Sequence, residues 1–170
     1  MGQDNILKVF FENPAGEFHI RGISKQLKIS KTAVNYHINK LLKKGLIVKN
    51  KSGTFPSFIA NESSELYRFY KKHEILKSII ECGLLDYLEN KLIPKSIFLF
   101  GSFAKGEYNK ESDVDLFIQS NESKIDLTKF EKRLKHKINI LFEPDANKLS
   151  HELLNNIING IRLRGFLKIK

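Results

Sequence analysis

The segment from Gly101 to Asp115, GSFAKGEYNKESDVD, constrains the fold of this 170-residue chain more than any other stretch. It opens with a Gly-Ser pair and closes with two aspartates one residue apart. The preceding run, Ser96 to Phe100, is short and apolar, and residues 114 to 118 alternate apolar with polar side chains, so both flanks favour strands. Since residues two apart on a strand face the same side, the sequence predicts that Asp113 and Asp115 project together near the Gly-Ser turn.

Carboxylates at this spacing suit divalent cations. Their Cα atoms lie about 6.5 to 7 Å apart on a strand, so their oxygens can converge on one ion or on two ions about 4 Å apart. The alternative is that Gly101-Ser102 only ends a strand and that Asp113 and Asp115 are solvated side chains of an edge strand. We favour the ion site because two like charges on one strand face repel each other unless a cation lies nearby.

The pattern Gly101-Ser102, a spacer, then SDVDL from Ser112 to Leu116 resembles the signature of the DNA polymerase β-type nucleotidyltransferase superfamily, closest to its minimal nucleotidyltransferase (MNT) branch. The resemblance implies that Gly101 and Ser102 bind nucleotide phosphates. It implies that Asp113 and Asp115 are the catalytic acids and hold Mg²⁺ or Mn²⁺. A nucleoside triphosphate, expected to be ATP, would be substrate or ligand, and a nucleoside monophosphate would pass to a hydroxyl acceptor.

One position departs from the family pattern. Competent members carry a third carboxylate on a later strand, and the corresponding segment here, Lys137 to Glu143, holds Asn139 at that place. An amide cannot act as a base at neutral pH. Glu143 lies roughly 13 Å further along an extended strand, too far to replace it. Transfer and simple nucleotide binding therefore both remain open.

Charge is concentrated in the first 60 residues, which contain ten Lys and Arg against three Asp and Glu, or seven of the chain's formal net charge of +10. Such an excess favours binding to a phosphate backbone. The single cysteine, Cys82, allows no internal disulfide. No apolar run approaches the length of a membrane span and no signal segment is evident, so we expect a cytoplasmic protein with no membrane partner.

Periodicity in the same region predicts three helices followed by a hairpin. The helices are expected at residues 4 to 12, 21 to 27 and 30 to 44, a short strand at 18 to 20, and hairpin strands at 46 to 50 and 54 to 60. Ser30 would cap the third helix and Gly45 would end it. The apolar stripe of that helix consists of Val34, Ile38, Leu41 and Leu42.

The segment GISKQLKISKTAVNYHINKLLKKGLIVKN resembles the winged helix-turn-helix domain of ArsR- or MarR-like microbial transcription factors. The resemblance implies binding to double-stranded DNA. The side chains expected in the major groove are Lys31, Thr32, Asn35, Tyr36 and Asn39, and those expected on flanking phosphates are Lys49 and Lys51. The alternative is a winged helix used only for protein contacts.

Three further helices are expected outside these motifs. Residues 62 to 92 keep a helical period, with Gly83 bending or dividing the helix, and the apolar positions are Leu66, Phe69, Tyr70, His73, Leu76, Ile80, Leu84, Leu88 and Leu92. This stripe would pack in a core or, as a second choice, form a homodimer seam. A helix at 126 to 136 would lead to the strand 138 to 142, and a terminal helix is expected at 148 to 164.

The sequence therefore predicts an α+β protein with three parts: a winged helix-turn-helix DNA-binding domain at residues 1–62, a linking helical segment at 63–92, and a small mixed-sheet nucleotidyltransferase-like domain at 93–170. Three functions remain open. The first is a DNA-binding nucleotidyltransferase. The second is a winged-helix regulator with a catalytically degenerate nucleotide-binding domain. The third is the MNT antitoxin of a pair whose toxin is a HEPN-type partner.

Overall fold

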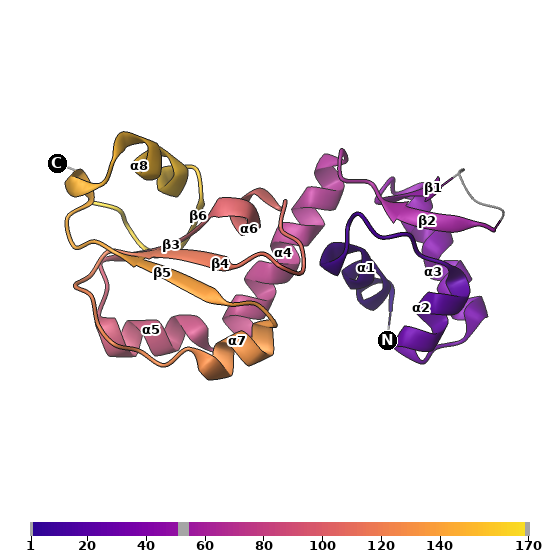
Figure 1. Cartoon of the computed structure of the whole chain (residues 1–170), viewed down its shortest axis with the longest axis horizontal. Coiled ribbons are helices and arrows are strands. Elements are labelled where there is room, and N and C mark those ends of the chain that lie inside the picture. The colour runs from indigo at the N-terminus through magenta and orange to yellow at the C-terminus, as the bar shows by residue number, and fades with distance from the viewer. Residues whose placement is uncertain (1, 51–54, 169–170) are drawn as a thin grey trace. The chain divides into compact units, whose positions relative to one another are not determined.

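The computed structural model describes residues 2–50 and 55–168, and the chain forms two compact units (Figure 1). Unit 1 is Met1–Lys71 and unit 2 is Lys72–Lys170. The fold is α+β, with the three-helix unit first and the mixed-sheet unit second, which confirms the predicted fold class. Within the described residues, no helix combines the length and apolarity needed to cross a bilayer.

Unit 1 consists of three helices and a two-stranded hairpin. These are α1 (Gln3–Glu12), α2 (Ile20–Leu27), α3 (Lys31–Lys43), β1 (Ile47–Asn50) and β2 (Ser57–Ala60), with β1 and β2 antiparallel. The strand expected at residues 18 to 20 is wrong. Phe18 makes a single bridge to Phe58, and the chain already turns into α2 at Ile20.

The predicted cap and stop of α3 are both confirmed in unit 1. The Ser30 hydroxyl accepts a hydrogen bond from the Ala33 N–H at 3.1 Å, so it caps α3. Gly45 has φ +67°, the left-handed conformation that ends a helix without a Cβ clash. The inward face of α3 is fully buried against α1 and α2, and the Tyr67 hydroxyl donates to the Phe10 carbonyl at 2.9 Å.

Unit 2 is built on a four-stranded mixed sheet in the order β5-β4-β3-β6. The strands are β3 (Ser96–Phe100), β4 (Val114–Ile118), β5 (Ile138–Phe142) and β6 (Ile161–Gly165). The helical elements are α4 (Glu65–Glu81), which begins in unit 1, α5 (Leu84–Leu92), α6 (Gly101–Lys105), α7 (Thr128–Leu134), the short 3₁₀ turn η1 (Ala146–Lys148) and α8 (His151–Ile158). Strand β4 is parallel to β5, whereas β3 is antiparallel to both β4 and β6.

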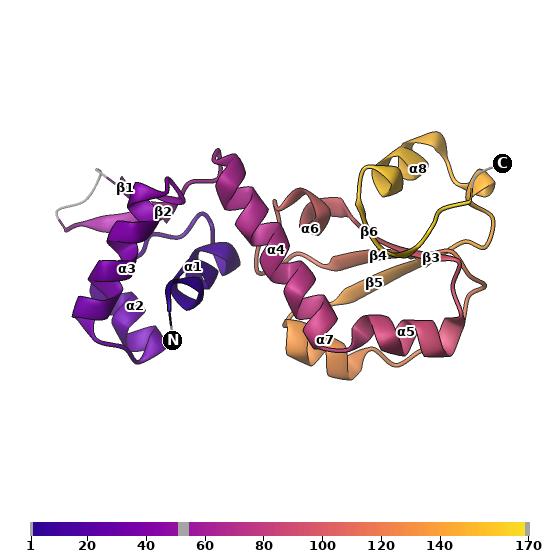
Figure 2. The same cartoon turned by 180° about the vertical axis from the view of Figure 1, so that it is seen from behind.

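Helices cover both faces of this sheet. Helices α5 and α7 lie against one face and α8 over the other, as Figures 1 and 2 show from opposite sides. Alternation along β4 explains the arrangement, because Val114 and Leu116 face the core under α5 and α7, whereas Phe117 packs with Ile157 of α8. Asp115, one residue from each of Val114 and Leu116, therefore lies on the α8 face.

The linking helix is divided at Gly83, as the sequence indicated; this residue has φ +77° and separates α4 from α5. The predicted apolar stripe is wrong in part. The buried side of α4 is carried by Tyr67, Ile75 and Ile79, whereas three residues of the predicted stripe are exposed: Leu66, Phe69 and Ile80. Apolar residues lie on two different sides of α4. The buried side is the one that carries Tyr67, because its ring packs in the core of unit 1 and its hydroxyl is hydrogen-bonded there.

The long terminal helix expected at residues 148 to 164 is also wrong. Ser150 caps α8, which ends at Ile158, and residues 161 to 165 form β6 on the edge of β3. Gly160 makes the turn possible, because a Cβ there would clash with the Leu99 carbonyl oxygen. Apolar and basic residues alternate in IRLRG, as in a strand, and this segment forms β6 although the residues before it have helical spacing.

We predict that Gly160→Ala destabilises unit 2 by about 1–3 kcal/mol, because the added methyl meets the β3 backbone, which cannot move aside. Gly22→Ala is the matched control, since Gly22 lies inside α2 and an added Cβ would have nothing within 4 Å of it, so it should be neutral or stabilising. Urea unfolding followed by circular dichroism measures both. A Gly160→Ala protein as stable as wild type would contradict the assignment of this turn.

Candidate functional site

The two aspartates of the GS…DVD segment converge with Asn139 at the first residues of β4 and β5. Asp113 directly precedes β4, Asp115 lies within it, and Asp115 is paired in register with Asn139. The Asn139 Nδ2 donates to Asp113 Oδ2 at 3.2 Å and to Asp115 Oδ1 at 3.3 Å. One amide group therefore bridges both carboxylates, at the place where the family pattern expects a third acid.

Gly101 lies against the carboxylate of Asp115, on the β3 side of β4. It follows β3, whose last residue, Phe100, is paired with Asp115. Its φ of +69° favours glycine, and a Cβ at this position would lie 2.5 Å from Asp115 Oδ2. Gly101 and Ser102 begin α6, where N–H groups of the first turn have no acceptor within the helix. The turn and the acids thus form one site.

The loop before β4 is fixed by its own side chains. The Asn109 side-chain oxygen accepts from the Glu111 N–H at 2.9 Å, and the Ser112 hydroxyl accepts from the Asn109 N–H at 3.0 Å. These bonds close a tight turn directly before Asp113. The position of the first carboxylate is therefore set by local structure as well as by the sheet.

The electrostatics of the site disfavour ionisation of Asp115. Burial raises the pKa of Asp115 above its usual value of 3.8, the hydrogen bond from Asn139 lowers it, and the negative charge of Asp113 raises it further, with a net increase. A cation between the carboxylates would reverse this effect, because it favours the charged form of both acids.

The site fits one divalent cation completed by the substrate. Mg²⁺ binds oxygen ligands and commonly takes one or two carboxylates together with phosphate oxygens and water. The carboxylates of Asp113 and Asp115 face one amide group and so point to a common place. Across residues 2–50 and 55–168 no group of three or more His, Cys, Asp or Glu could hold a metal, so the remaining ligands would come from phosphate and water.

Two other acids near the sheet do not join this site. Glu143 Oε1 accepts from the Asp145 N–H at 2.9 Å, and Asp145 Oδ1 accepts from the Asn147 N–H at 3.2 Å. Both carboxylates are held in the turn after β5. This agrees with the expectation from sequence that Glu143 is too far along the strand to replace a third acid.

The residues predicted to bind DNA form the exposed side of α3. Lys31, Thr32, Asn35, Tyr36 and Asn39 are all exposed, on the side opposite the buried stripe. The Lys40 ammonium lies 4.3 Å from the centre of the Tyr36 ring. Lys49 is exposed on β1, and Lys51 lies outside the described residues.

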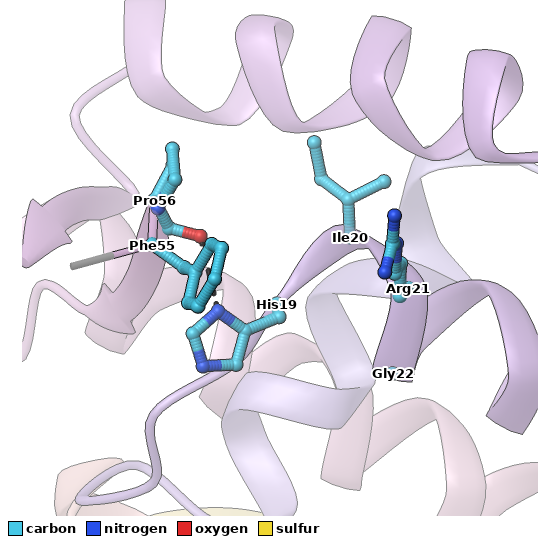
Figure 3. Close-up of a pocket in the computed structure, with 6 residues that line it drawn as sticks. All are labelled: His19, Ile20, Arg21, Gly22, Phe55 and Pro56. Carbon is cyan, nitrogen blue, oxygen red and sulfur yellow. Dashed lines mark hydrogen bonds between the residues drawn. The ribbon is translucent and has the colours of Figure 1, made fainter. Parts of the chain in front are cut away.

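An open apolar pocket of about 540 Å³ lies in unit 1. Its lining residues are His19, Ile20, Arg21, Gly22, Phe55 and Pro56. Figure 3 shows the Phe55 ring beside the His19 imidazole, whose Nδ1 is hydrogen-bonded to the Pro56 carbonyl at 3.1 Å. None of the six residues carries a carboxylate, so this pocket offers no acidic ligand for a divalent cation.

Sequence reasoning missed a group of basic residues next to Asp113. Lys110, Lys135, His136 and Lys137 line a pocket together with that acid. The signal was present in the sequence, because Lys137 is two residues before Asn139 and Lys110 is three before Asp113. No spacing rule, however, connects two loops that are distant along the chain.

The mixed sheet with paired acids beside a Gly-Ser turn, following three helices and a hairpin, defines a nucleotidyltransferase fold joined to a winged helix-turn-helix. Comparison with known proteins agrees. Residues 81–160 match the nucleotidyltransferase domain family, and residues 19–48 match the winged helix-turn-helix DNA-binding family. These matches confirm both resemblances at the level of the two domain families.

One curated relative is the Methanocaldococcus jannaschii protein named "Putative protein adenylyltransferase MJ1379". It is 35% identical over 60 residues, which are 35% of this chain and 49% of that protein. The chain thus matches about half the length of this relative. No solved structure matches the chain.

We predict that Asp115→Asn stabilises the cation-free protein at pH 7. Because the folded pKa of Asp115 is raised above 3.8, ionisation costs stability as pH rises through 3.8 to the raised value, and that cost then stays constant. The variant removes the cost, so its unfolding temperature should exceed that of wild type at pH 7, and the difference should shrink towards pH 3.

Asp126→Asn is the control of opposite sign, since hydrogen bonds from Thr128 lower the pKa of Asp126 and its ionised form favours the folded state. Differential scanning fluorimetry with EDTA across pH 3 to 8 measures both variants. An Asp115→Asn protein that melts below wild type at pH 7 would show that ionisation of Asp115 does not destabilise the folded state.

Proposed function

We propose that this chain transfers a nucleoside monophosphate from a nucleoside triphosphate, ATP in the first instance, to a hydroxyl acceptor. The observation that carries the proposal is the convergence of Asp113, Asp115 and Gly101 at the end of one sheet, with 2.5 Å between Asp115 Oδ2 and a Cβ built on Gly101. Nucleotidyl transfer depends mainly on positioning and on neutralising phosphate charge, and this arrangement can supply both.

In the proposed reaction, the acceptor oxygen forms a bond to the α-phosphorus. The bond from that phosphorus to the oxygen bridging it to the β-phosphate breaks, and pyrophosphate leaves with the electron pair. The hydroxyl proton passes to water, because the amide of Asn139 cannot take it. Attacking and leaving oxygens lie roughly in line across the phosphorus, so they need binding groups on opposite sides.

The proposed roles follow from position. Gly101 and Ser102 donate hydrogen bonds to the β- and γ-phosphates from the start of α6. Asp113 and Asp115 hold the divalent ion, Mg²⁺ or Mn²⁺, which would neutralise charge on the triphosphate. Asn139 orients both carboxylates through its bridging amide.

We further propose that the acceptor hydroxyl belongs to a protein. The support is the name of the relative from M. jannaschii, which describes a protein adenylyltransferase, and the 35% identity over 60 residues that the two chains share. This extends to the present chain what that name states of the relative.

A specific observation favours a second candidate, a DNA-binding regulator whose nucleotidyltransferase domain binds nucleotide without turnover. The Asn139 amide already satisfies both carboxylates, and it replaces an acid that could accept a proton. The two candidates predict the same nucleotide binding and differ in transfer.

We predict that Asn139→Asp raises the rate of nucleotidyl transfer about a hundredfold, since a carboxylate can serve as a base or a further metal ligand where an amide cannot. Transfer of label from α-³²P-ATP with Mg²⁺ to a tyrosine-containing peptide or to the chain itself measures the rate. Asp113→Ala should abolish both transfer and magnesium-dependent ATP binding.

Glu143→Gln is the matched control for this series. It removes a carboxylate of the same sheet region whose hydrogen bond is to the Asp145 N–H, in the turn after β5. It should leave ATP binding and transfer unchanged. Wild type that binds Mg²⁺·ATP without transfer, with transfer appearing in Asn139→Asp, would favour the regulator. A wild-type protein that binds no nucleotide with Mg²⁺ would reject both candidates.

We propose that the winged helix-turn-helix unit binds duplex DNA with the exposed side of α3 in the major groove. Support comes from the match to the DNA-binding family and from the exposure of the α3 side chains. Asn35, Asn39 and Lys31 can read base edges, and Lys49 of the hairpin would contact a phosphate.

We predict that Lys49→Ala reduces the slope of log K against log salt concentration by about 1 for a nonspecific duplex, because one phosphate contact is lost. Lys91→Ala, which removes an exposed lysine of α5 in unit 2, should leave the slope unchanged. Fluorescence anisotropy with a labelled duplex at several salt concentrations measures both slopes. Equal slopes for wild type and Lys49→Ala would show that Lys49 of the hairpin does not contact a DNA phosphate.

A further inference from the structure

A second pocket, of about 390 Å³, opens beside the first catalytic aspartate. Two loops line it, residues 110–113 before β4 and residues 135–137 before β5. The lining residues are Lys110, Glu111, Ser112, Asp113, Lys135, His136 and Lys137. Neither the family resemblance nor the GS and DVD motifs give these basic residues a role.

The two loops are held together by hydrogen bonds. His136 Nδ1 lies 2.8 Å from the Ser112 carbonyl oxygen, and the Val114 N–H donates to the Lys137 carbonyl at 2.8 Å. Because a carbonyl only accepts, the His136 hydrogen must be on Nδ1. The imidazole also packs edge-on against Phe103, with ring centres 4.9 Å apart. The pocket walls are therefore built into the fold of unit 2.

The charges of the pocket favour a small anion. Three lysines are opposed by Glu111 and Asp113, which leaves a net charge of +1 with a neutral imidazole. All three lysines are exposed, and the ammonium groups of Lys110 and Lys137 can reach a ligand. A carboxylate fits this balance, and a divalent ion held by Asp113 and Asp115 would make the surroundings of the pocket more positive still. No arginine, whose planar fork suits phosphate, is among the lining residues.

The strand order places the pocket loop before β5 across the aspartates from the Gly101-Ser102 turn. In the sheet order β5-β4-β3-β6, the Gly101-Ser102 turn follows β3 and the pocket loops precede β4 and β5. The turn thus lies on the β3 side of Asp113 and Asp115, and the pocket loop of residues 135–137 lies on their β5 side. If pyrophosphate leaves on the Gly101 side, an in-line reaction brings the acceptor hydroxyl from the pocket side.

We propose that the pocket beside Asp113 binds an acidic side chain next to the acceptor hydroxyl of a protein substrate. Lys110 and Lys137 contact that carboxylate and set the specificity for the acceptor. This inference rests on the proposed transferase function, and it deepens it by naming an acidic protein segment as the acceptor.

The test uses the full-length chain and two fluorescein-labelled peptides. One peptide carries a single tyrosine between two glutamates on each side, and its twin carries glutamines at those positions. The double variant Lys110→Ala/Lys137→Ala removes two pocket charges. The matched control, Lys91→Ala/Lys124→Ala, removes two exposed lysines of unit 2 that do not line the pocket. Lys135 is kept, because its φ of +60° makes its substitution a backbone change as well.

Fluorescence anisotropy with Mg²⁺ and a non-hydrolysable ATP analogue should show tighter binding of the glutamate peptide than of the glutamine peptide. The pocket variant should lose at least tenfold affinity for the glutamate peptide and no longer distinguish the two peptides. The control variant should behave as wild type. Calorimetry should show unchanged affinity for the ATP analogue in both variants, which also verifies folding.

Three results would overturn the inference. Wild type could bind both peptides equally, the two double variants could lose affinity equally, or a single-stranded oligonucleotide ending in a 3′ hydroxyl could bind in a way that depends on Lys110 and Lys137 while the peptides do not. The last result would assign the pocket to nucleic acid. Failure of the proposed function is distinguishable, because it appears as absence of label transfer from α-³²P-ATP in wild type, whereas failure of this inference appears in the comparison of the two peptides.

Discussion

Repulsion between two carboxylates held at the end of one strand is the constraint around which unit 2 is arranged. In the absence of a cation, the amide of Asn139 is what reaches both Asp113 and Asp115, and burial still raises the pKa of Asp115. Such a pair persists only where the surrounding structure fixes it. Here the fixing comes from apolar packing on both faces of the sheet and from the tight turn at Asn109 to Ser112.

The amide of Asn139 also bears on whether the protein is an enzyme or a regulator. A donor between two acids stabilises the site without metal, but it leaves the reaction without a side-chain base. The sheet therefore accounts for nucleotide binding more fully than for turnover. The proposed DNA binding of unit 1 has separate support, from the exposed polar side of α3 and from the match to the winged helix-turn-helix family.

Much of the fold could be predicted because local and tertiary preferences agree. Residues 96 to 100 have the composition of a buried strand and form β3 with those bounds, and Gly83 and Ser30 act as the stop and cap that their types indicate. Asn139 could be placed at the third acid position of the family pattern because apolar residues flank it, and the structure pairs it with Asp115. The family resemblances are confirmed, whereas the roles of individual site residues remain predictions.

The failures have physical causes of two kinds. Helix α4 carries apolar residues on two sides, and the packing of Tyr67 in the core of unit 1 shows which side is buried. The terminal segment carries helical spacing followed by strand alternation, and the contact of Gly160 with β3 places the boundary. The basic pocket was not predicted because its loops are adjacent only through β4–β5 pairing.

Strand β6 has a practical implication for anyone dividing this protein. The nucleotidyltransferase family match ends at residue 160, but residues 161 to 165 cover the edge of β3, and the Lys168 carbonyl accepts from the Gln119 side chain. A polypeptide cut where the family match stops would leave SIFLF, five residues without a charge, as an open strand edge. Open apolar edges recruit other chains, so such a fragment would aggregate for reasons unrelated to its chemistry.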